Sequence, residues 1–404
     1  MSFLLVQFMD YKEVFLNMLQ TKRKINCHSK VINILYISPL SPPYGGLASW
    51  TEIILKKGLP YPFKVHIVNT GQINRTLFDP LRLNFSEVKR NISILWKLLK
   101  VIKKQKIDLI HLNSSLAQFG IFRDWLCTFI SRIYKIPYVI HLHIDVEVRS
   151  KKAITFNGKP FLYQNIFRRA SAIIVLNNQS KETVLSLGDF VDKTFYLPNF
   201  VDIDSIPTKK MYISEGKYSN AVFVGALTES KGVYQLLKVL RKTLNLKITF
   251  IGEPTKGVQV KVQRLIRKYN ISERVFLKGV LPNRETLDIM SLSDFFIFPT
   301  HEEGFPISVA EAMAIGLPVL ASPAGAIPDM IEDGKGGYII DPENIEGYVK
   351  AINIFERNRE LLFQMGKYNQ EKAKTNYDYP IVVERICKLY KTVLGFDLII
   401  SEKT

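Results

Sequence analysis

The feature that most limits the fold of this 404-residue chain is a regular alternation of two kinds of segment. From Val31 onward, short runs rich in valine and isoleucine alternate with longer segments whose apolar residues repeat at helical spacing. This alternation is typical of βαβ units, in which helices cover both faces of a parallel sheet. The predicted fold class is therefore α/β.

The alternation occurs twice, and a polar stretch at residues 199–218 separates the two copies. This stretch contains Pro207 and Gly216 and is typical of an interdomain linker. Because a chain of this length exceeds what one hydrophobic core usually supports, we expect two domains. The expected strands are 31–37, 65–68, 107–112, 138–142, 172–176 and 194–197 before the linker, and 221–224, 248–251, 275–277, 295–298, 319–321 and 338–340 after it. Two such sheets place their ligand crevices opposite one another.

Positive charge is concentrated in the first half of the chain. Residues 1–200 hold 28 Lys and Arg against 12 Asp and Glu, whereas residues 201–404 hold 27 against 25. The resulting balance of +16 suggests an anionic partner, such as an acidic membrane surface, a phosphorylated acceptor or a nucleic acid. A lysine-rich set of solvated helix faces would give the same asymmetry. No nucleic-acid-binding module is recognised, so no nucleic acid is expected.

The cysteines and the apolar runs bear on the compartment. Cys27, Cys127 and Cys387 form no C-x-x-C pair, which argues against a disulfide framework or a zinc site and fits a reducing cytosol. No run approaches the roughly 18 to 20 apolar residues that span a bilayer. We expect a cytoplasmic protein, either free or peripheral at the inner face of the membrane. Residues 1–30 lack the features of a signal peptide and are interpreted as an N-terminal extension or the result of an upstream start codon.

The most informative passage is FFIFPTHEEGFPISVAEAMAIGLPVL at residues 295–320. A buried strand is expected to end at Pro299, and a helix to begin near Pro306. The first amides of that helix, at residues 307–309, have no partners within the helix. Together with the positive end of the helix dipole they form a site for an anion such as a diphosphate, and Ser308 adds a hydroxyl.

Two glutamates of this passage are predicted to line one edge of the crevice. Glu303 lies on the loop at the mouth of the helix, and Glu311 lies on its second turn. A carboxylate accepts hydrogen bonds from two sugar hydroxyls well, so the pair is suited to sugar binding. The alternative is an acidic residue that favours the helix dipole together with a solvated mid-helix glutamate.

The passage resembles the E-x7-E motif of glycosyltransferase family 4, the "glycosyl transferases group 1" enzymes with the GT-B fold. The resemblance implies two Rossmann-like domains that face a cleft, with Glu303 at the donor sugar and Glu311 at the ribose of the nucleotide. It also implies donor contacts from the residues between them, which are Gly304, Phe305, Pro306, Ile307 and Ser308. Members of the family are generally retaining and metal-independent, so no metal site and no cofactor are expected beyond the nucleotide-diphosphate sugar, which is a substrate.

Two glycine-containing passages follow the order of that family. SPLSPPYGGLASW, residues 38–50, contains Gly45 and Gly46, which let a backbone approach a phosphate or sugar without a Cβ in the way, although a simple turn has the same pattern. The resemblance places this loop against the diphosphate and the sugar of the donor.

In AVFVGALTESKGV, residues 221–233, a strand ends at Gly225 and Lys231 precedes the next helix. Lys231 is thus placed to put a positive charge on a diphosphate leaving group. The family pattern has an arginine where this chain has Ala226, which removes one of the two usual cations.

IPYVIHLHID at residues 136–145 predicts a strand whose end delivers His143 into the crevice. His143 lies six residues after Pro137, and at that spacing the resemblance implies a histidine that sits by the reacting sugar and takes part in catalysis. His141, two residues earlier on the same strand face, is a rival. A hydrogen-bonded core histidine is the alternative for either.

Two further segments are interpreted with less detail. YLPNFVD at residues 196–202 resembles the domain crossover of the family, with Phe200 in place of the usual glycine. A helix is predicted across residues 88–104, where Lys and Arg accompany the apolar positions Ile92, Leu95, Leu99 and Ile102. Both an interfacial helix on anionic lipid and a core-packed helix with a lysine-rich solvent face fit this pattern.

These features together predict an enzyme of the hexosyltransferase class. It would transfer a hexose-type sugar from a nucleotide-diphosphate-sugar donor to a hydroxyl of a glycan or lipid-linked acceptor, with retention, in surface polysaccharide or glycoconjugate biosynthesis. The expected parts are residues 1–30 as an extension, 31–200 as the acceptor-binding domain, 201–378 as the nucleotide-sugar-binding domain and 379–404 as a C-terminal helix that returns to the first domain. The basic first half adds an anionic membrane surface as a partner.

Two other functions remain open on the sequence alone. A nucleotide-sugar 2-epimerase shares the two-domain architecture but needs additional acid and base residues. A non-catalytic sugar-nucleotide-binding paralogue is suggested by Ala226.

Overall fold

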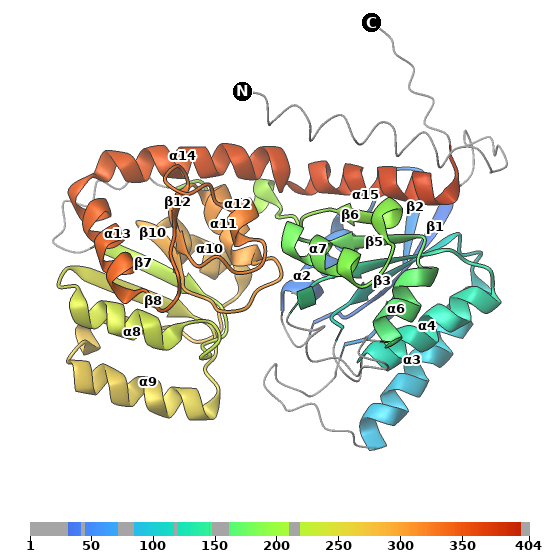
Figure 1. Ribbon diagram of the computed structural model, residues 1–404, viewed down its shortest axis with the longest axis horizontal. Helices are drawn as coiled ribbons and strands as arrows, with labels where there is room; N and C mark the ends of the chain where they lie inside the picture. The colour runs from blue at the N-terminus through green and yellow to red at the C-terminus, as the bar shows by residue number, and fades with distance from the viewer. Residues whose placement is uncertain are drawn as a thin grey trace, which may run out of the picture.

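The structure is a computed structural model that describes residues 31–41, 45–71, 85–116, 120–144, 146–147, 161–209 and 219–396. It contains two α/β units side by side, each built on a sheet of six parallel strands (Figure 1). Residues 1–30, which are predicted to be an extension, lie outside the described part of the chain. The α/β fold class with two Rossmann-like units is confirmed.

The first sheet has the strand order β2-β1-β3-β4-β5-β6. Every neighbouring pair in it is parallel, so the carboxyl ends of all six strands lie at one edge. Its strands are β1 (Ile32–Ser38), β2 (Phe63–Asn69), β3 (Leu109–Ser114), β4 (Tyr138–Leu142), β5 (Ala172–Val175) and β6 (Thr194–Tyr196). All six strands expected before the linker are therefore present.

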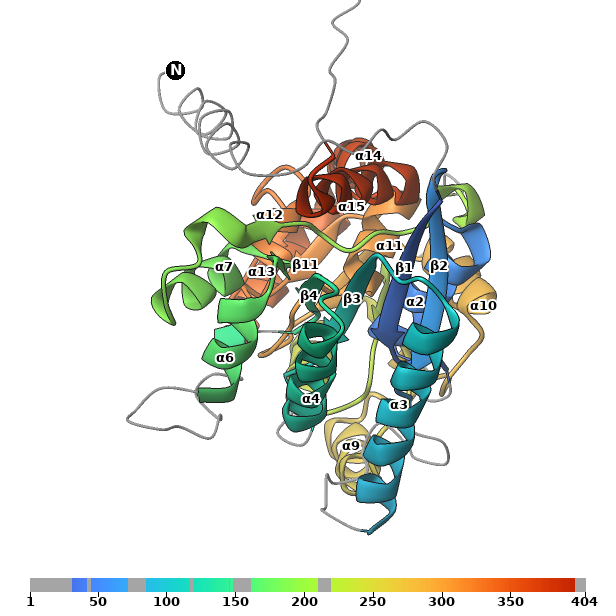
Figure 2. The same ribbon diagram turned by 90° about the vertical axis from the view of Figure 1, so that its right-hand side faces the viewer.

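Helices cover both faces of the first sheet. One face packs on a row of three neighbouring helices, α3, α4 and α6, through a core that includes Ile94, Ile121 and Phe167 (Figure 2). The other face packs on α2 and on the C-terminal helix α15. The helices of this unit are α2 (Gly46–Lys57), α3 (Phe85–Lys104), α4 (Gly120–Ile133), α6 (Phe161–Arg169) and α7 (Asn178–Ser186), with short 3₁₀ turns η2 (Val191–Lys193) and η3 (Ile203–Ser205).

Helix α3 differs in one respect from its prediction. Its core-facing stripe is Ile94, Leu98 and Ile102, which are all buried, whereas Ile92 is 51% exposed and Trp96 is 71% exposed. The apolar stripe read from the sequence was Ile92, Leu95, Leu99 and Ile102, of which only Ile102 belongs to the buried set. Two residues of helix correspond to roughly 200° of rotation, so Ile92 and Trp96 lie opposite Ile94 and Leu98. Apolar residues on both faces made the sequence pattern ambiguous.

The second sheet has the strand order β12-β11-β10-β7-β8-β9, again with every pair parallel. The direction of chain progression reverses between the neighbouring strands β7 and β10, which form the switch point where ligands of open α/β sheets bind. The strands are β7 (Ser219–Val224), β8 (Leu246–Ile251), β9 (Val275–Leu277), β10 (Phe295–Phe298), β11 (Val319–Ala321) and β12 (Gly337–Ile339). All six strands expected after the linker are present.

The helices of the second unit enclose one large apolar core. That core includes the strand residues Phe223, Phe250 and Phe296. The helices are α8 (Val233–Lys242), α9 (Lys256–Tyr269), α10 (Asn283–Ser291), α11 (Ile307–Ile315), α12 (Ile327–Met330), α13 (Ile345–Arg357) and α14 (Arg359–Asn376), with the 3₁₀ turn η4 (Ser272–Arg274). Within the described ranges, no helix is both long enough and apolar enough to cross a membrane.

Helix α15 (Tyr379–Leu394) returns to the first unit, as predicted, and α14 and α15 run along one side of both units (Figure 1). Its buried residues Val382 and Ile386 belong to the same core as the strand residue Ile34. The two chain crossings hydrogen bond to each other, because the Val201 amide donates to the Tyr377 carbonyl and the Tyr379 amide donates to the Val201 carbonyl. The crossings thus form one joint.

Phe200 stands at this joint where the family pattern has glycine. Its side chain is buried, and its ring lies 5.4 Å from that of Trp50 and 5.0 Å from that of Tyr379, centroid to centroid. The larger side chain therefore fills space between α2 of the first unit and the returning helix α15.

Candidate functional site

The strand order of the second sheet brings Lys231 and Glu303 together. Lys231 lies on the loop after β7, and Glu303 lies on the loop after β10, which is the neighbouring strand at the switch point. The Lys231 ammonium is 2.6 Å from Glu303 Oε1 and also donates to the Glu302 carbonyl at 2.8 Å. Both side chains are about one fifth exposed. An ion pair at the edge of the crevice results.

Gly232 allows the loop after β7 to pack closely against the end of β10. Its φ of 74° lies in the left-handed region, and a Cβ there would stand 2.0 Å from the Pro299 carbonyl oxygen. No side chain fits at that distance, so the loop after β7 packs directly on the end of β10. Gly225, which was also predicted to contact the donor, ends β7 at the same edge.

The beginning of α11 offers two free amides. Pro306 precedes the helix, and the Val309 amide already donates to the Pro306 carbonyl at 3.1 Å. The predicted anion site at residues 307–309 is therefore reduced to the amides of Ile307 and Ser308, which have no hydrogen-bond partner among the described residues. Helix N-termini of this kind bind phosphate and carboxylate groups.

Phe305 and Pro306 were predicted to contact the donor, and their side chains lie inside the fold. Both are buried, and the Phe305 ring lies 5.5 Å from the ring of Tyr377. Any contact of Phe305 with a ligand would therefore be made by its backbone.

Glu311 is placed on the second turn of α11, as predicted. Its side chain is half-buried, and its Oε1 accepts a hydrogen bond from Nδ2 of Asn283 at 2.9 Å. Burial raises the pKa of Glu311 to about 7, and the hydrogen bond from Asn283 opposes that rise. Asn283 opens α10 and was not among the predicted site residues. Hydrogen bonds from ligand hydroxyls would stabilise the ionised form of this partly desolvated carboxylate.

The loop around Gly304 is one of the places where the two units touch. The Gly304 carbonyl accepts a hydrogen bond from Nδ2 of Asn177 at 2.9 Å, and Asn177 is buried at the start of α7. A Cβ on Gly304 would lie 2.9 Å from the Cα of Ile144 in the first unit. Asn177 was not predicted, although a polar residue two positions after the end of the buried strand β5 is a recognisable signal.

Gly46 closes a second contact across the units. It begins α2, and a Cβ at this position would lie 3.4 Å from Cδ1 of Ile307. Gly45 precedes it in an extended conformation. The residues before Gly45 in this loop, 42–44, lie outside the described ranges. The Gly45-Gly46 segment therefore lies against the Ile307 side chain at the beginning of α11.

His143 lies directly after β4, but its side chain turns toward a buried polar cluster. Its Nε2 is 3.0 Å from Oδ1 of Asn113, and its ring centroid is 3.9 Å from that of His141. Oδ1 of Asn113 is also 3.0 Å from Nε2 of His111. The structure thus brings together three histidines, of which the sequence analysis considered two.

The hydrogen bonds of this cluster assign its protons. Nδ2 of Asn113 donates to the Ser38 hydroxyl, which leaves Oδ1 to accept from Nε2–H of both His111 and His143. Nδ1 of His111 then accepts from the hydroxyl of Tyr390 on α15. Burial lowers the pKa of His111 to about 3 and lowers the pKa of His141 and His143 well below the usual value. All three histidines are therefore neutral.

The segment after β4 contacts the second unit through its backbone and not through the His143 ring. Ile144, the next residue, is the one that Gly304 approaches. The described residues contain no group of three or more His, Cys, Asp and Glu side chains suited to a metal ion. The described site therefore consists of the Lys231–Glu303 ion pair, two free amides of α11 and the Glu311 carboxylate with its raised pKa. On the side of the first unit it is bordered by the segment that follows the neutral His143.

Comparison with known proteins shows the family of the chain. Residues 208–372 match the family model "Glycosyl transferases group 1", and residues 58–205 match the family model "Glycosyltransferase Family 4". The chain is 26% identical to an uncharacterized 41.2 kDa protein in the cps region of Klebsiella pneumoniae, over 72% of this chain and 81% of that protein. It is 22% identical to the putative colanic acid biosynthesis glycosyltransferase WcaL of Salmonella typhimurium, over 64% of each chain.

The fold has solved counterparts. The Anabaena protein HepE, in complex with UDP and glucose, aligns with a TM-score of 0.68 at 17% identity, over 89% of this chain and 99% of that chain. Among the curated relatives, the matched share of the relative's own length ranges from 56% to 98%.

Proposed function

This chain is a glycosyltransferase of the glycosyl transferases group 1 family, and we propose that it transfers a hexose-type sugar from a nucleotide-diphosphate donor to a hydroxyl of a glycan or lipid-linked acceptor. The observation that carries the proposal is the Lys231–Glu303 ion pair at the switch point, beside the two free amides of α11. Relatives named for capsule-region and colanic acid genes support a role in surface polysaccharide biosynthesis.

In the proposed donor complex, each group has one task. The Lys231 ammonium and the amides of Ile307 and Ser308 stabilise the negative charge of the departing diphosphate. Glu303 accepts hydrogen bonds from hydroxyls of the donor sugar, and Glu311 accepts them from the ribose. The Gly45-Gly46 turn covers the diphosphate from the first domain.

As the bond to the diphosphate lengthens, positive charge develops on the sugar. The acceptor hydroxyl then attacks from the side of the leaving group, which gives retention, and its proton passes to the departing phosphate oxygen. Lys231 supplies the single side-chain cation of this proposal, since Ala226 replaces the family arginine.

The proposal is tested by a donor screen followed by a transfer assay. Thermal shifts with UDP, GDP and ADP sugars identify the donor, with UDP-glucose as the first candidate because a structural neighbour was solved with UDP and glucose. Transfer of the labelled sugar to a lipid-linked oligosaccharide pool, with release of the nucleotide, would support the proposal. An isomerised sugar from donor alone would instead support a 2-epimerase. Nucleotide binding without transfer or hydrolysis for any donor would support a non-catalytic binding protein.

Donor affinity is expected to fall as the pH is lowered through the pKa of Glu311. The ionised carboxylate accepts two ribose hydroxyls, whereas the protonated group has lost one acceptor position, so binding favours the ionised form. With a pKa of about 7, the Kd for the nucleotide should rise about tenfold from about pH 8 to about pH 6. Calorimetric titrations at both pH values measure this change.

The matched control for this prediction is the neighbouring exposed carboxylate Glu285 on α10. Glu311→Gln should bind the nucleotide more weakly at the higher pH and show no pH slope, whereas Glu285→Gln should keep the slope. A slope that persists in Glu311→Gln would contradict the assignment.

Adding one methyl group at Gly304 is expected to separate the two domains and slow turnover. The new Cβ would overlap the backbone of Ile144, at 2.9 Å from its Cα, so the cleft cannot close to its present width. A displacement of about 1 Å between reacting groups can lower the rate about 100-fold. Steady-state kinetics of Gly304→Ala should show this loss in kcat. Gly257→Ala is the control, because no heavy atom lies within 4 Å of its Cβ position, and normal kcat in Gly304→Ala would refute the prediction.

A further inference from the structure

The outward face of α4 carries three aromatic residues in a row. The ring of Trp125 stacks on that of Phe122 at 5.8 Å and on that of Phe129 at 6.3 Å. Phe122 is 53% exposed, Phe129 is 44% exposed, and Ile133 at the end of the helix is 61% exposed. Their spacing of seven and then four residues places these side chains on one side of the helix.

Helix α3 adds to the same apolar surface. Figure 2 shows α3 beside α4 in the row of helices that covers the sheet. Ile92 and Trp96 point away from the core, because Ile94 and Leu98 on the opposite side of α3 are buried. Single exposed apolar residues are ordinary, but a group of them on neighbouring helices marks an interaction surface.

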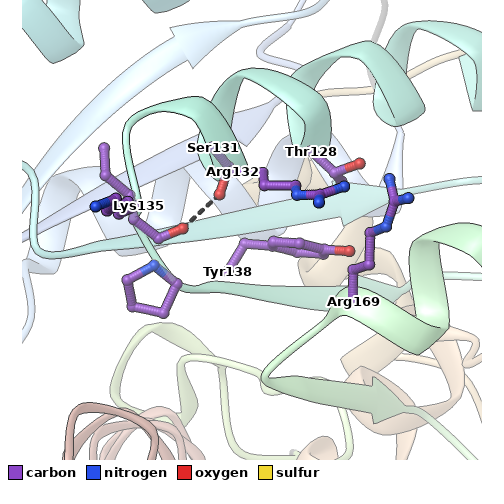
Figure 3. Close-up of a pocket in the computed structure, with 8 residues that line it drawn as sticks. Thr128, Ser131, Arg132, Lys135, Tyr138 and Arg169 are labelled. Atoms are coloured by element: carbon purple, nitrogen blue, oxygen red, sulfur yellow. Dashed lines mark hydrogen bonds between the residues drawn. The ribbon is translucent and has the colours of Figure 1, made fainter.

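A cavity of about 590 Å³ lies where α4 ends, and it is rich in positive charge. Arg132 projects from the last turn of α4, Lys135 from the following turn and Arg169 from the end of α6, around the ring of Tyr138 (Figure 3). The lining residues are Thr128, Ser131, Arg132, Lys135, Ile136, Pro137, Tyr138 and Arg169. The cavity thus opens at the amino-terminal edge of the first sheet, where Tyr138 begins β4, roughly 16 Å along the strand from His143.

The cations of this cavity are available, whereas its hydroxyls are not. Thr128, Ser131 and Tyr138 donate their hydroxyl hydrogens to the backbone carbonyls of Trp125, Ile136 and Ile166. Within the described part of the chain, no ion pair is formed by Arg132, Lys135 or Arg169. The cavity is therefore suited to an anion recognised chiefly by charge, such as a phosphate monoester or diester.

We propose that the outward face of α3 and α4 docks on an anionic phospholipid membrane, with a lipid phosphate in the cavity and Phe122, Phe129 and Ile133 in the head-group region. Exposed aromatic and aliphatic side chains beside unpaired Arg and Lys are the combination that anionic membrane surfaces select. The balance of +16 in the first half of the chain favours the same partner.

This docking leaves the reaction cleft free, because the cleft lies at the carboxyl edges of the sheets and the cavity lies at the opposite edge of the first sheet. The inference deepens the proposed function by placing the enzyme on the surface where a lipid-linked acceptor is found. Its test does not depend on turnover.

The test is vesicle flotation of the full chain at about 0.15 M salt. Wild-type protein should float with phosphatidylcholine vesicles that contain about one third phosphatidylglycerol, and should not float with phosphatidylcholine alone. Each cation contributes roughly a fivefold factor, so Arg132→Gln/Lys135→Gln/Arg169→Gln should weaken binding about 100-fold. The control Arg264→Gln/Arg267→Gln/Lys268→Gln removes the same charge from exposed positions of α9 and should bind within a few-fold of wild type.

A second variant tests the apolar contact without changing charge. Phe129→Ser/Ile133→Ser should weaken binding to the anionic vesicles about tenfold or more. Trp96 and Trp125 should show a blue-shifted fluorescence with these vesicles in the wild type. Nucleotide affinity measured on the same preparations confirms that each variant is folded.

Three outcomes would overturn the proposal. They are equal flotation of the cavity variant and the wild type, equal losses in the cavity and α9 variants, and stabilisation by inorganic phosphate without any vesicle binding. Vesicle binding by a protein that binds no nucleotide sugar would refute the proposed function and leave the docking surface standing.

Discussion

Replacing Glu303 by glutamine should lower the transfer rate about 1,000-fold while the affinity for the free nucleotide changes little. The carboxylate is the partner of Lys231 at 2.6 Å and lies on the loop where the donor sugar is proposed to bind. Glutamine keeps the shape but loses the charge that faces the developing positive charge of the sugar. The free nucleotide has no sugar, so its binding depends on other groups. Single-turnover transfer and nucleotide titration on the same variant separate the two effects.

The control for this variant is the next residue in the loop. Glu302 has an exposed side chain, and its contact with Lys231 is made by the backbone carbonyl, which Glu302→Gln retains. Glu302→Gln should therefore transfer at close to the wild-type rate. The ion pair lies at the protein surface with both side chains partly exposed, so it contributes about 1 kcal/mol or less to stability and Glu303→Gln should remain folded. Unchanged turnover in Glu303→Gln would refute the role of this residue.

Replacing Lys231 by glutamine should weaken both nucleotide binding and turnover. We expect a nucleotide Kd at least tenfold higher and a kcat/KM about 1,000-fold lower, because the diphosphate loses its proposed side-chain cation. The substitution also leaves Glu303 without its partner next to an anionic ligand. The resulting repulsion adds to the loss.

Two further variants serve as controls for the Lys231→Gln prediction. Lys238→Gln on α8 removes an exposed cation from the same domain and should change neither constant. The double variant Lys231→Gln/Glu303→Gln should lose much less than the product of the single losses, because the two side chains act as a pair. Wild-type nucleotide affinity in Lys231→Gln would show that the diphosphate binds elsewhere.

The fold could be predicted from the sequence because each buried parallel strand is a continuous apolar run that can be recognised locally. All twelve expected strands are present, six in each sheet. Such strands are continuous apolar runs between helical segments, so their positions do not depend on distant residues. The order of the strands was not predicted, and that order is what places Lys231 beside Glu303 across 72 residues of sequence.

The first-domain side of the site was harder to predict because its hydrogen bonds are long-range. His111 pairs with Tyr390, which is 279 residues away on the returning helix α15. The signal in the sequence is the alternation of the polar residues His111 and Asn113 with the apolar residues Ile110 and Leu112 in a fully buried strand. His143 was favoured over His141 by its spacing from Pro137, and the structure holds both rings in the same neutral cluster.

The central claim is best tested by a crystal structure of this chain with the nucleotide diphosphate selected by the donor screen. The claim predicts ribose hydroxyls within hydrogen-bond distance of the Glu311 carboxylate, and phosphate oxygens at the amides of Ile307 and Ser308 and at the Lys231 ammonium. A nucleotide bound away from the switch point of the second sheet, or one whose phosphates leave these groups untouched, would contradict it.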